Sequence, residues 1–175
     1  MIIFLDTEFT GLGQRWPRLI SMGIVSEDGR YSFYAELTPE SYRDQCSHWV
    51  QANIFPLLEG GDRVMDPDKL RQRLTKWISV LGDVRVVTDA PDYDFAFLRA
   101  TLVPWPANVD PKPIRFDAQT LGDCHKEKLE NYRGAYFTPT KPEHHSLNDA
   151  WALRRAWQRA KDLDAFQAYA KKLGL

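Results

Sequence analysis

Two acidic residues, Asp6 and Glu8, follow a short apolar run at the start of the chain. The run, residues 2–5, is typical of a buried strand because it is continuous and rich in β-branched and aromatic residues. Side chains alternate between the two faces of a strand, so Asp6 and Glu8 are expected to point the same way. Neighbouring carboxylates at a buried position repel each other and resist desolvation, and a bound divalent cation relieves both effects. The alternative is a strand end with two solvated acids.

A second acidic stretch, residues 89–94, follows a strand predicted at residues 84–88. An amphipathic helical pattern precedes that strand, so a helical crossover is expected to make it parallel to the first strand. The ends of neighbouring parallel strands meet at one edge of a sheet, which would bring Asp94 close to the first two acids. The alternative is a turn in which Asp89 or Asp92 only caps a helix.

A third stretch, residues 144–149, begins with two histidines and opens a helix predicted at residues 146–161. Ser146 and Asp149 are spaced as in a variant of the capping box, and a carboxylate in the first turn is stabilised by the helix dipole. A histidine beside such an acid can take a proton from water near neutral pH. The alternative is a solvated loop. Asp117, at the end of another predicted strand, is interpreted mainly as a helix cap.

The composition of the chain limits the kinds of partner it can have. Its 175 residues carry a net charge of −1, so no overall basic field attracts nucleic acid, and a polyanion site has to be local or supplied by metal ions. Its two cysteines form no metal-binding spacing or disulfide framework, which is typical of a reducing, cytoplasmic compartment. No apolar segment is long enough to predict a membrane span, and no signal peptide is expected.

The pattern of elements predicts one α/β domain, residues 1–175, with a mixed five-stranded sheet and helices on its faces. The chain opens with a strand and then a hairpin around Asp28-Gly29, and helices alternate with strands afterwards. The predicted strands are residues 2–5, 19–25, 31–36, 84–88 and 114–117. The predicted helices are residues 41–50, 67–81, 92–102, 118–131, 146–161 and 164–173.

Three short motifs together resemble the DEDDh family of 3′–5′ exonucleases. They are Asp6-Thr7-Glu8, then Tyr93-Asp94 with Phe97-Leu98, and last His144 followed by four residues and Asp149. Each motif alone is weak, but all three occur in order, in the expected strand and helix contexts, across residues 6–150. Within this family the chain is most similar to ribonuclease AS, and more distantly similar to oligoribonuclease and ribonuclease T.

The resemblance implies a ribonuclease H-like fold and an enzyme that shortens single-stranded or short RNA from its 3′ end, releasing nucleoside 5′-monophosphates. It implies two divalent cations, Mg²⁺ or Mn²⁺, in a two-metal-ion mechanism. The implied metal ligands are Asp6, Glu8, Asp94 and Asp149. His144 is implied as the general base, and the 3′-terminal nucleotide is implied to contact Phe9, Thr10, Gly11 and Leu12. Small stand-alone relatives also imply a homodimer.

Two departures from the family pattern bear on the site. Asp89 and Asp92 lie before the middle motif, where many relatives carry a histidine and an asparagine or one asparagine, so the sugar contacts are in question. His145 directly follows His144, so the general base is assigned by spacing alone.

Several alternatives stay open at this point. The protein could be a DNA exonuclease or one indifferent to the sugar, which recognition of the 2′-hydroxyl would decide, or a non-catalytic nucleic-acid-binding relic. Phe9 could be a core residue, and the aromatic residues of the loop before His144 could form a lid or pack in the core; they are Tyr132, Tyr136 and Phe137. A local track for the RNA backbone could come from the basic residues Lys112, Arg115, Lys126, Lys128, Arg133 and Lys141.

Overall fold

The computed structural model describes all of residues 1–175 and contains one mixed sheet of six strands. Their order is β4-β3-β2-β1-β5-β6. Strands β1, β2 and β3 are antiparallel, whereas β4, β5 and β6 each run parallel to the neighbour they pair with. The strands are β1 (Ile2–Phe9), β2 (Leu19–Ser26), β3 (Ser32–Leu37), β4 (Val64–Met65), β5 (Arg85–Thr88) and β6 (Ile114–Arg115). The mixed α/β architecture predicted from the sequence is therefore confirmed, with one strand more than expected.

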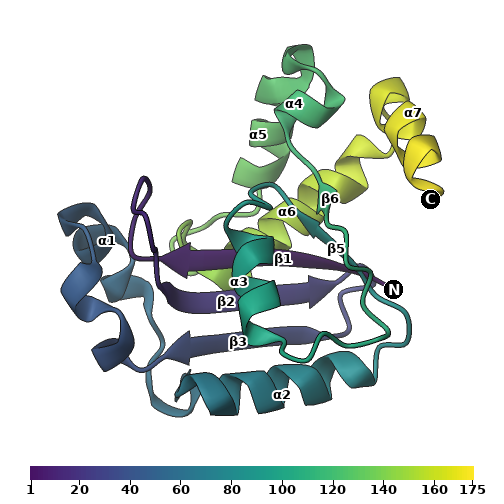
Figure 1. The fold of residues 1–175 in the computed structure, drawn as a ribbon. Coiled ribbons are helices and arrows are strands. Elements are labelled where there is room, and N and C mark those ends of the chain that lie inside the picture. The colour runs from purple at the N-terminus through teal and green to yellow at the C-terminus, as the bar shows by residue number, and fades with distance from the viewer.

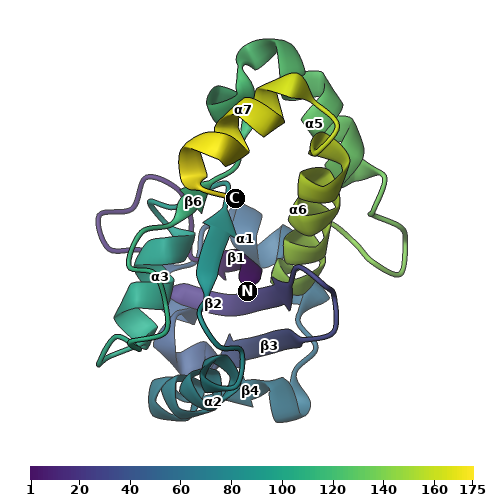
Figure 2. The same cartoon turned by 90° about the vertical axis from the view of Figure 1, so that its right-hand side faces the viewer.

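Helices cover both faces of the sheet (Figures 1 and 2). On one face, α2 (Pro67–Ser79) and α3 (Asp94–Thr101) pack against the strand residues Ile3 and Leu5. On the other, α5 (Lys126–Gly134), α6 (Ser146–Ala160) and α7 (Asp164–Leu173) share a second core with Phe4. The alternation of side chains along β1 thus feeds two separate cores, as a strand buried on both faces requires.

The crossover to β5 runs through α2 and places β5 beside β1 in parallel, as predicted. Helix α2 begins at Pro67 because the side chain of Asp66 accepts a hydrogen bond from the backbone N–H of Lys69 at 2.8 Å. Leu70, Leu74 and Ile78 form its buried stripe. The end of β5 and the start of α3 consequently lie at the same edge of the sheet as the end of β1.

Helix α6 lies directly on β2 because β2 has a glycine at the point of contact. A Cβ atom built on Gly23 would lie 2.3 Å from backbone atoms of Ser146 and Leu147. Gly23 pairs with Asp6 across the β1–β2 ladder, so its missing side chain lies on the same face of the sheet as the Asp6 carboxylate. The first turn of α6 can therefore approach β1 where Asp6 projects.

Several segments differ from the sequence-based prediction. The helix expected over residues 118–131 is two helices, α4 (Ala118–Leu121) and α5, because Gly122 adopts a φ of 100° between them. The helix expected over residues 41–50 is two 3₁₀ turns followed by α1 (His48–Asn53), which Ser47 caps. Strand β4 has only two residues and follows a Gly-Gly turn, so no alternating pattern predicted it.

No helix of the fold combines the length and the apolar character needed to cross a lipid bilayer.

Candidate metal centre

Five carboxylates converge at one edge of the sheet. Their oxygens form two overlapping groups, and within each group the candidate ligand atoms lie within 4.8 Å of one another. Both groups contain Asp6; one adds Glu8 and Asp149, and the other adds Asp89 and Asp94. The structure thus brings together the four acids predicted as ligands and adds Asp89, which was not among the predicted ligands.

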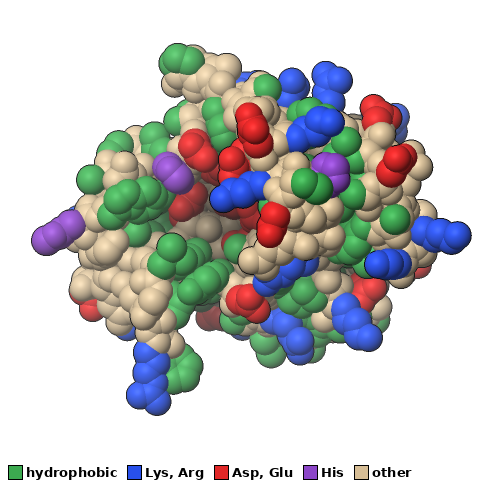
Figure 3. Space-filling model, turned by 90° about the horizontal axis from the view of Figure 1, so that it is seen from above, with side chains coloured by type: hydrophobic (Ala, Val, Ile, Leu, Met, Phe, Trp, Pro, Cys, Tyr) green, Lys and Arg blue, Asp and Glu red, His purple; other side chains and the backbone are tan.

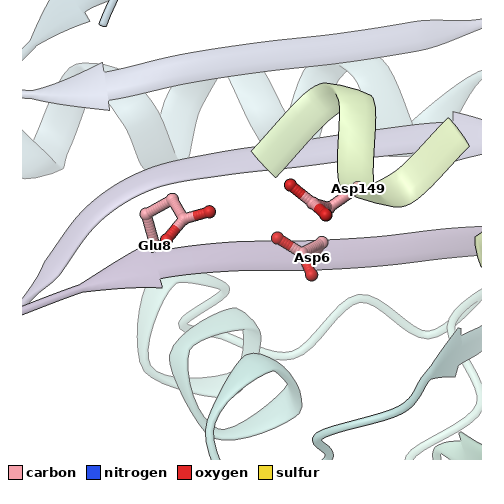
Figure 4. Close-up of side chains that lie close together, drawn as sticks. All are labelled: Asp6, Glu8 and Asp149. Carbon is pink, nitrogen blue, oxygen red and sulfur yellow. The ribbon is translucent and has the colours of Figure 1, made fainter. Parts of the chain in front are cut away.

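Strand β1 positions two of the acids, and α6 positions a third. Asp6 and Glu8 point to the same side of β1, as their spacing predicts, and the carboxylate of Asp149 faces them from the first turn of α6 (Figure 4). The carboxylates of Asp6 and Glu8 accept no hydrogen bond from the protein. Two partly buried acids therefore have lone pairs that no protein donor satisfies.

Asp94 is held by three hydrogen bonds from two threonines. Its Oδ1 accepts from the backbone N–H of Thr7 at 3.1 Å and from the Thr7 hydroxyl at 2.7 Å, and its Oδ2 accepts from the Thr88 hydroxyl. Burial raises the pKa of Asp94 from 3.8 to about 7, although these hydrogen bonds favour the charged form and act in the opposite direction. The three donors fix Asp94 at the junction of β1, β5 and α3.

Asp149 is oriented by the backbone just before its own helix. Its Oδ2 accepts a hydrogen bond from the N–H of His145 at 3.0 Å, and burial raises its pKa from 3.8 to about 7. The predicted cap at Ser146 is wrong: His145 occupies the N-cap position, and Ser146 is the first helical residue. The Ser146 hydroxyl instead lies 3.0 Å from that of Ser21, which ties α6 to β2.

Burial and mutual repulsion act most strongly on the two acids of β1. Burial, followed by the charges of Asp149 and Asp94, raises the pKa of Glu8 from 4.5 to about 8 and that of Asp6 well above its usual range. An all-oxygen set of unpaired carboxylates suits hard divalent cations such as Mg²⁺ and Mn²⁺. The residues present therefore fit a metal ion chemically, and the acidic cluster could hold one.

The two adjacent histidines have different environments. His145 is buried, stacks on Tyr34 with ring centroids 4.5 Å apart, and places its Nε2 3.4 Å from a carboxylate oxygen of Glu59. Burial lowers its pKa. His144 has a left-handed backbone with a φ of 65°, and its ring lies nearly perpendicular to that of Trp49 with the ring centroids 5.0 Å apart. The imidazole of His145 is thus packed into the protein, whereas that of His144 stands beside α1.

A pocket of about 420 Å³ adjoins the cluster. Leu12 and Trp49 are its exposed apolar walls, at 77% and 54% exposure. The remaining lining residues are Glu8, Phe9, Gly11, Ser47 and Val50. Since Glu8 belongs to both the pocket and the acidic cluster, a molecule seated in the pocket lies next to the carboxylates. Trp49 was not predicted as a site residue; its signal in the sequence is an aromatic residue two positions after Ser47, the cap of α1.

Two of the four residues expected to contact a nucleotide have clear packing roles. Phe9 stacks on Tyr93 with ring centroids 4.7 Å apart. Thr10 is buried, its hydroxyl accepts from the backbone N–H of Arg18 at 3.0 Å, and its carbonyl accepts from Ser47. Phe9, Gly11 and Leu12 line the pocket, whereas Thr10 does not.

The alternative in which Asp89 or Asp92 caps α3 is wrong. Tyr93 holds the N-cap position of α3 and provides no side-chain hydrogen bond. Asp89 instead pairs with Arg133, and Asp92 pairs with Arg115 at 3.0 Å. Three of the six basic residues considered as an RNA track, Arg115, Lys126 and Arg133, are therefore engaged with acids. Asp117 does cap a helix, accepting from the N–H of Thr120 at 2.8 Å. Among the aromatic residues considered as a lid, Tyr136 stacks on Trp151.

Comparisons with known proteins give no further identification. No protein-family model matches the chain. No significant match is found among curated proteins.

Seen from above, acidic side chains gather around a hollow with a histidine at its rim and hydrophobic side chains alongside (Figure 3). The protein thus has a mixed α/β fold with an acidic cluster that could hold a metal ion.

Proposed function

We propose that this protein is a metal-dependent 3′–5′ exoribonuclease, a single domain of the DEDDh type with a ribonuclease H-like fold. The observation that carries the proposal is the convergence of the four motif acids from β1, α3 and α6, far apart in sequence, with Asp6 common to both groups of candidate ligands. Chance acids at strand and helix ends have no reason to meet in this way. Asp6, Glu8, Asp94 and Asp149 would hold the cations, and Asp89 belongs to the second group of candidate ligands.

Two divalent cations, Mg²⁺ or Mn²⁺, would stabilise the attacking and leaving oxygens of a phosphodiester when bound. The protein residues supply the rest. Asp6 would contribute to both cation sites, and the hydrogen bonds from Thr7 and Thr88 keep Asp94 in a fixed orientation. Fixed ligands lower the cost of organising the site at the moment of reaction.

His144 is the residue proposed to take the proton from the attacking water. The other candidate, His145, uses its ring for stacking on Tyr34 and for the contact with Glu59. His144 instead contacts Trp49, which lines the pocket together with Glu8. A neutral imidazole can accept a proton from a water molecule, which is the role of a general base.

The pocket beside Glu8 is the proposed seat of the 3′-terminal nucleotide. Its volume of about 420 Å³ is within the range of small-molecule sites. Leu12 and Trp49 offer apolar and aromatic surface on which any base can stack, so the site would select a chain end more than a sequence. The cleavage product would be a nucleoside 5′-monophosphate.

The test uses RNA and DNA 12-mers of matched sequence, labelled at the 5′ end, with Mg²⁺, Mn²⁺ or EDTA. We expect a metal-dependent ladder that shortens from the 3′ end and forms faster on RNA. Asp94→Asn should abolish it while the protein stays folded. Asp62→Asn, a change at an exposed acid outside the cluster, is the matched control and should leave the ladder unchanged.

The outcomes separate the alternatives. Equal digestion of RNA and DNA would keep the reaction and remove the preference for ribose. Binding of the labelled RNA without digestion would favour a nucleic-acid-binding relic. Digestion that persists in Asp94→Asn would contradict the site assignment.

A further inference from the structure

Asp89 is the only one of the five clustered acids that forms an ion pair. Its Oδ2 lies against Nη1 of Arg133, a residue in the last turn of α5. The side chain of Arg133 is 26% exposed and makes no other hydrogen bond or ion pair with a side chain. Asp89 is thus compensated by a permanent positive charge, while the guanidinium keeps free donors.

The two groups of candidate ligands are therefore unequal before any cation binds. In the first, the carboxylates of Asp6 and Glu8 accept no hydrogen bond and form no ion pair, and the charge of Arg133 reaches Asp6 and Asp149 only through space. In the second, Asp89 faces Arg133 and Asp94 accepts three hydrogen bonds. A metal ion that enters the second group has to share Asp89 with the guanidinium of Arg133 or displace that guanidinium.

We propose that Arg133 is an internal counter-cation that competes with the second divalent cation for Asp89. The inference rests on the proposed function for the nature of the metal ions, and it concerns how this chain regulates the loading of its own site. The second cation binds more weakly than the first because Arg133 must turn away from Asp89. A substrate phosphate offers Arg133 an alternative partner, since a guanidinium matches two phosphate oxygens with paired hydrogen bonds.

The arrangement also accounts for the departure at Asp89 from the family pattern. An added acid beside four others would be costly without a counter-charge, and α5 supplies that charge from a segment more than forty residues further along the chain. Asp89 and Arg133 thus act together: Asp89 adds a candidate ligand to the second group, and Arg133 competes with a metal ion for that ligand.

The test is calorimetric titration of the metal-free, full-length protein with Mn²⁺, with no substrate present. Wild type is expected to show one stronger and one weaker site. Arg133→Gln should tighten the weaker site by at least about tenfold, the effect of removing one unit charge a few ångströms from a bound cation. Arg133→Lys keeps the charge and should show little of this gain. In Asp89→Asn, a second change of Arg133→Gln should give no gain, because the contested ligand is gone.

Arg115→Gln is the matched control, since Arg115 also pairs with an acid of the same loop, Asp92, which lies outside both groups of ligands. It should leave both Mn²⁺ affinities unchanged. Circular dichroism checks that each variant folds. If Arg133→Gln does not fold, the titrations of Asp89→Asn and Arg133→Lys test the role of Arg133 in its place.

An unchanged or weakened second site in Arg133→Gln would overturn the role of Arg133 and leave the proposed function standing. An equal gain in Arg133→Gln and Arg115→Gln would also overturn it, because the effect would then reflect net charge alone. Absence of Mn²⁺ binding to wild type would overturn the proposed function, and this inference with it.

Discussion

Glu8 is a partly buried carboxylate with acidic neighbours and no hydrogen-bond donor, so its charged form is disfavoured in the folded protein. Burial, followed by the charges of Asp149 and Asp94, raises its pKa from 4.5 to about 8. Between these values the folded protein holds a proton that the unfolded chain releases. The stability associated with Glu8 is therefore present below about pH 4.5 and lost as the pH rises through about 8.

Glu8→Gln should stabilise the metal-free protein by removing this charge. At pH 8 in EDTA we expect the free energy of unfolding to rise by about 1–2 kcal/mol. This value is smaller than the pKa shift alone would give at roughly 1.4 kcal/mol per pKa unit, because Glu8 is partly exposed to water, which screens its charge. At pH 5 the gain should be smaller, since wild-type Glu8 is then protonated. Urea denaturation followed by circular dichroism measures both values. A loss of stability at pH 8 would contradict the proposed electrostatics.

Strand alternation predicted that Asp6 and Glu8 share a face, and the expected parallel strand brought Asp94 to the same edge. Asp149 was placed with them only by the family resemblance. The roles of Asp89 and Trp49 were not predictable in the same way. Each depends on a partner far away in sequence, Arg133 for one and His144 for the other, and no local pattern encodes such a contact.

At the scale of elements, the approach of α6 to β2 decides whether the acids can meet. The two backbones touch at Gly23, and the hydroxyls of Ser21 and Ser146 add a polar tie close by. Asp149 follows one turn later and faces Asp6 (Figure 4). The separation between these carboxylates thus depends on the thickness of the contact between helix and sheet.

Gly23→Ala should therefore damage the site as well as the fold. The new Cβ would lie 2.3 Å from backbone atoms that cannot rotate away, so α6 has to shift. We expect a destabilisation of about 1–3 kcal/mol, typical of overpacking, and at least about a tenfold weakening of Mn²⁺ binding. Thermal melting and calorimetry measure the two effects.

Gly134→Ala is the control for that variant, because a Cβ there meets no atom within 4 Å and the residue lies in α5. It should be neutral or slightly stabilising, since alanine favours the helix. Equal Mn²⁺ affinity in Gly23→Ala and wild type would show that the helix contact does not set the carboxylate spacing.

Element prediction succeeded where patterns were long and bounded by caps. Helix α2, with Asp66 as its cap and Pro67 at its start, was expected from a repeat of three and four residues, and so was the parallel placement of β5. It failed where elements are short. Strand β4 has too few residues to alternate, and Gly122 divides a segment whose composition favours one continuous helix.

At the scale of the whole molecule, the acids come from helices that pack on opposite faces of the sheet. Asp94 begins α3, which packs in the core containing Ile3 and Leu5, whereas Asp149 lies on α6, in the core containing Phe4. A cation held by both groups would link the two layers. Metal binding should therefore stabilise the entire fold, because the unfolded chain cannot assemble these ligands.

The melting temperature should then depend on pH and on metal together. In EDTA it should fall as the pH rises from about 5 to about 8, because the raised pKa values of the clustered acids mean that the folded protein binds more protons than the unfolded chain. Mg²⁺ should raise it more at pH 8 than at pH 5, since protons compete for the same oxygens. Scanning fluorimetry measures both series. A melting temperature indifferent to Mg²⁺ and Mn²⁺ at pH 8 would count against the metal centre.

The contact at Gly23 also has a consequence for finding related chains. An Asp-x-Glu triplet is common, but a glycine in the second strand directly opposite the first acid of that triplet is required here by touching backbones. Homologues that have lost the clustered acids would still need glycine at this position to keep the helix in place. The pairing of that glycine with the triplet is thus a search pattern that distinguishes true relatives from chance matches.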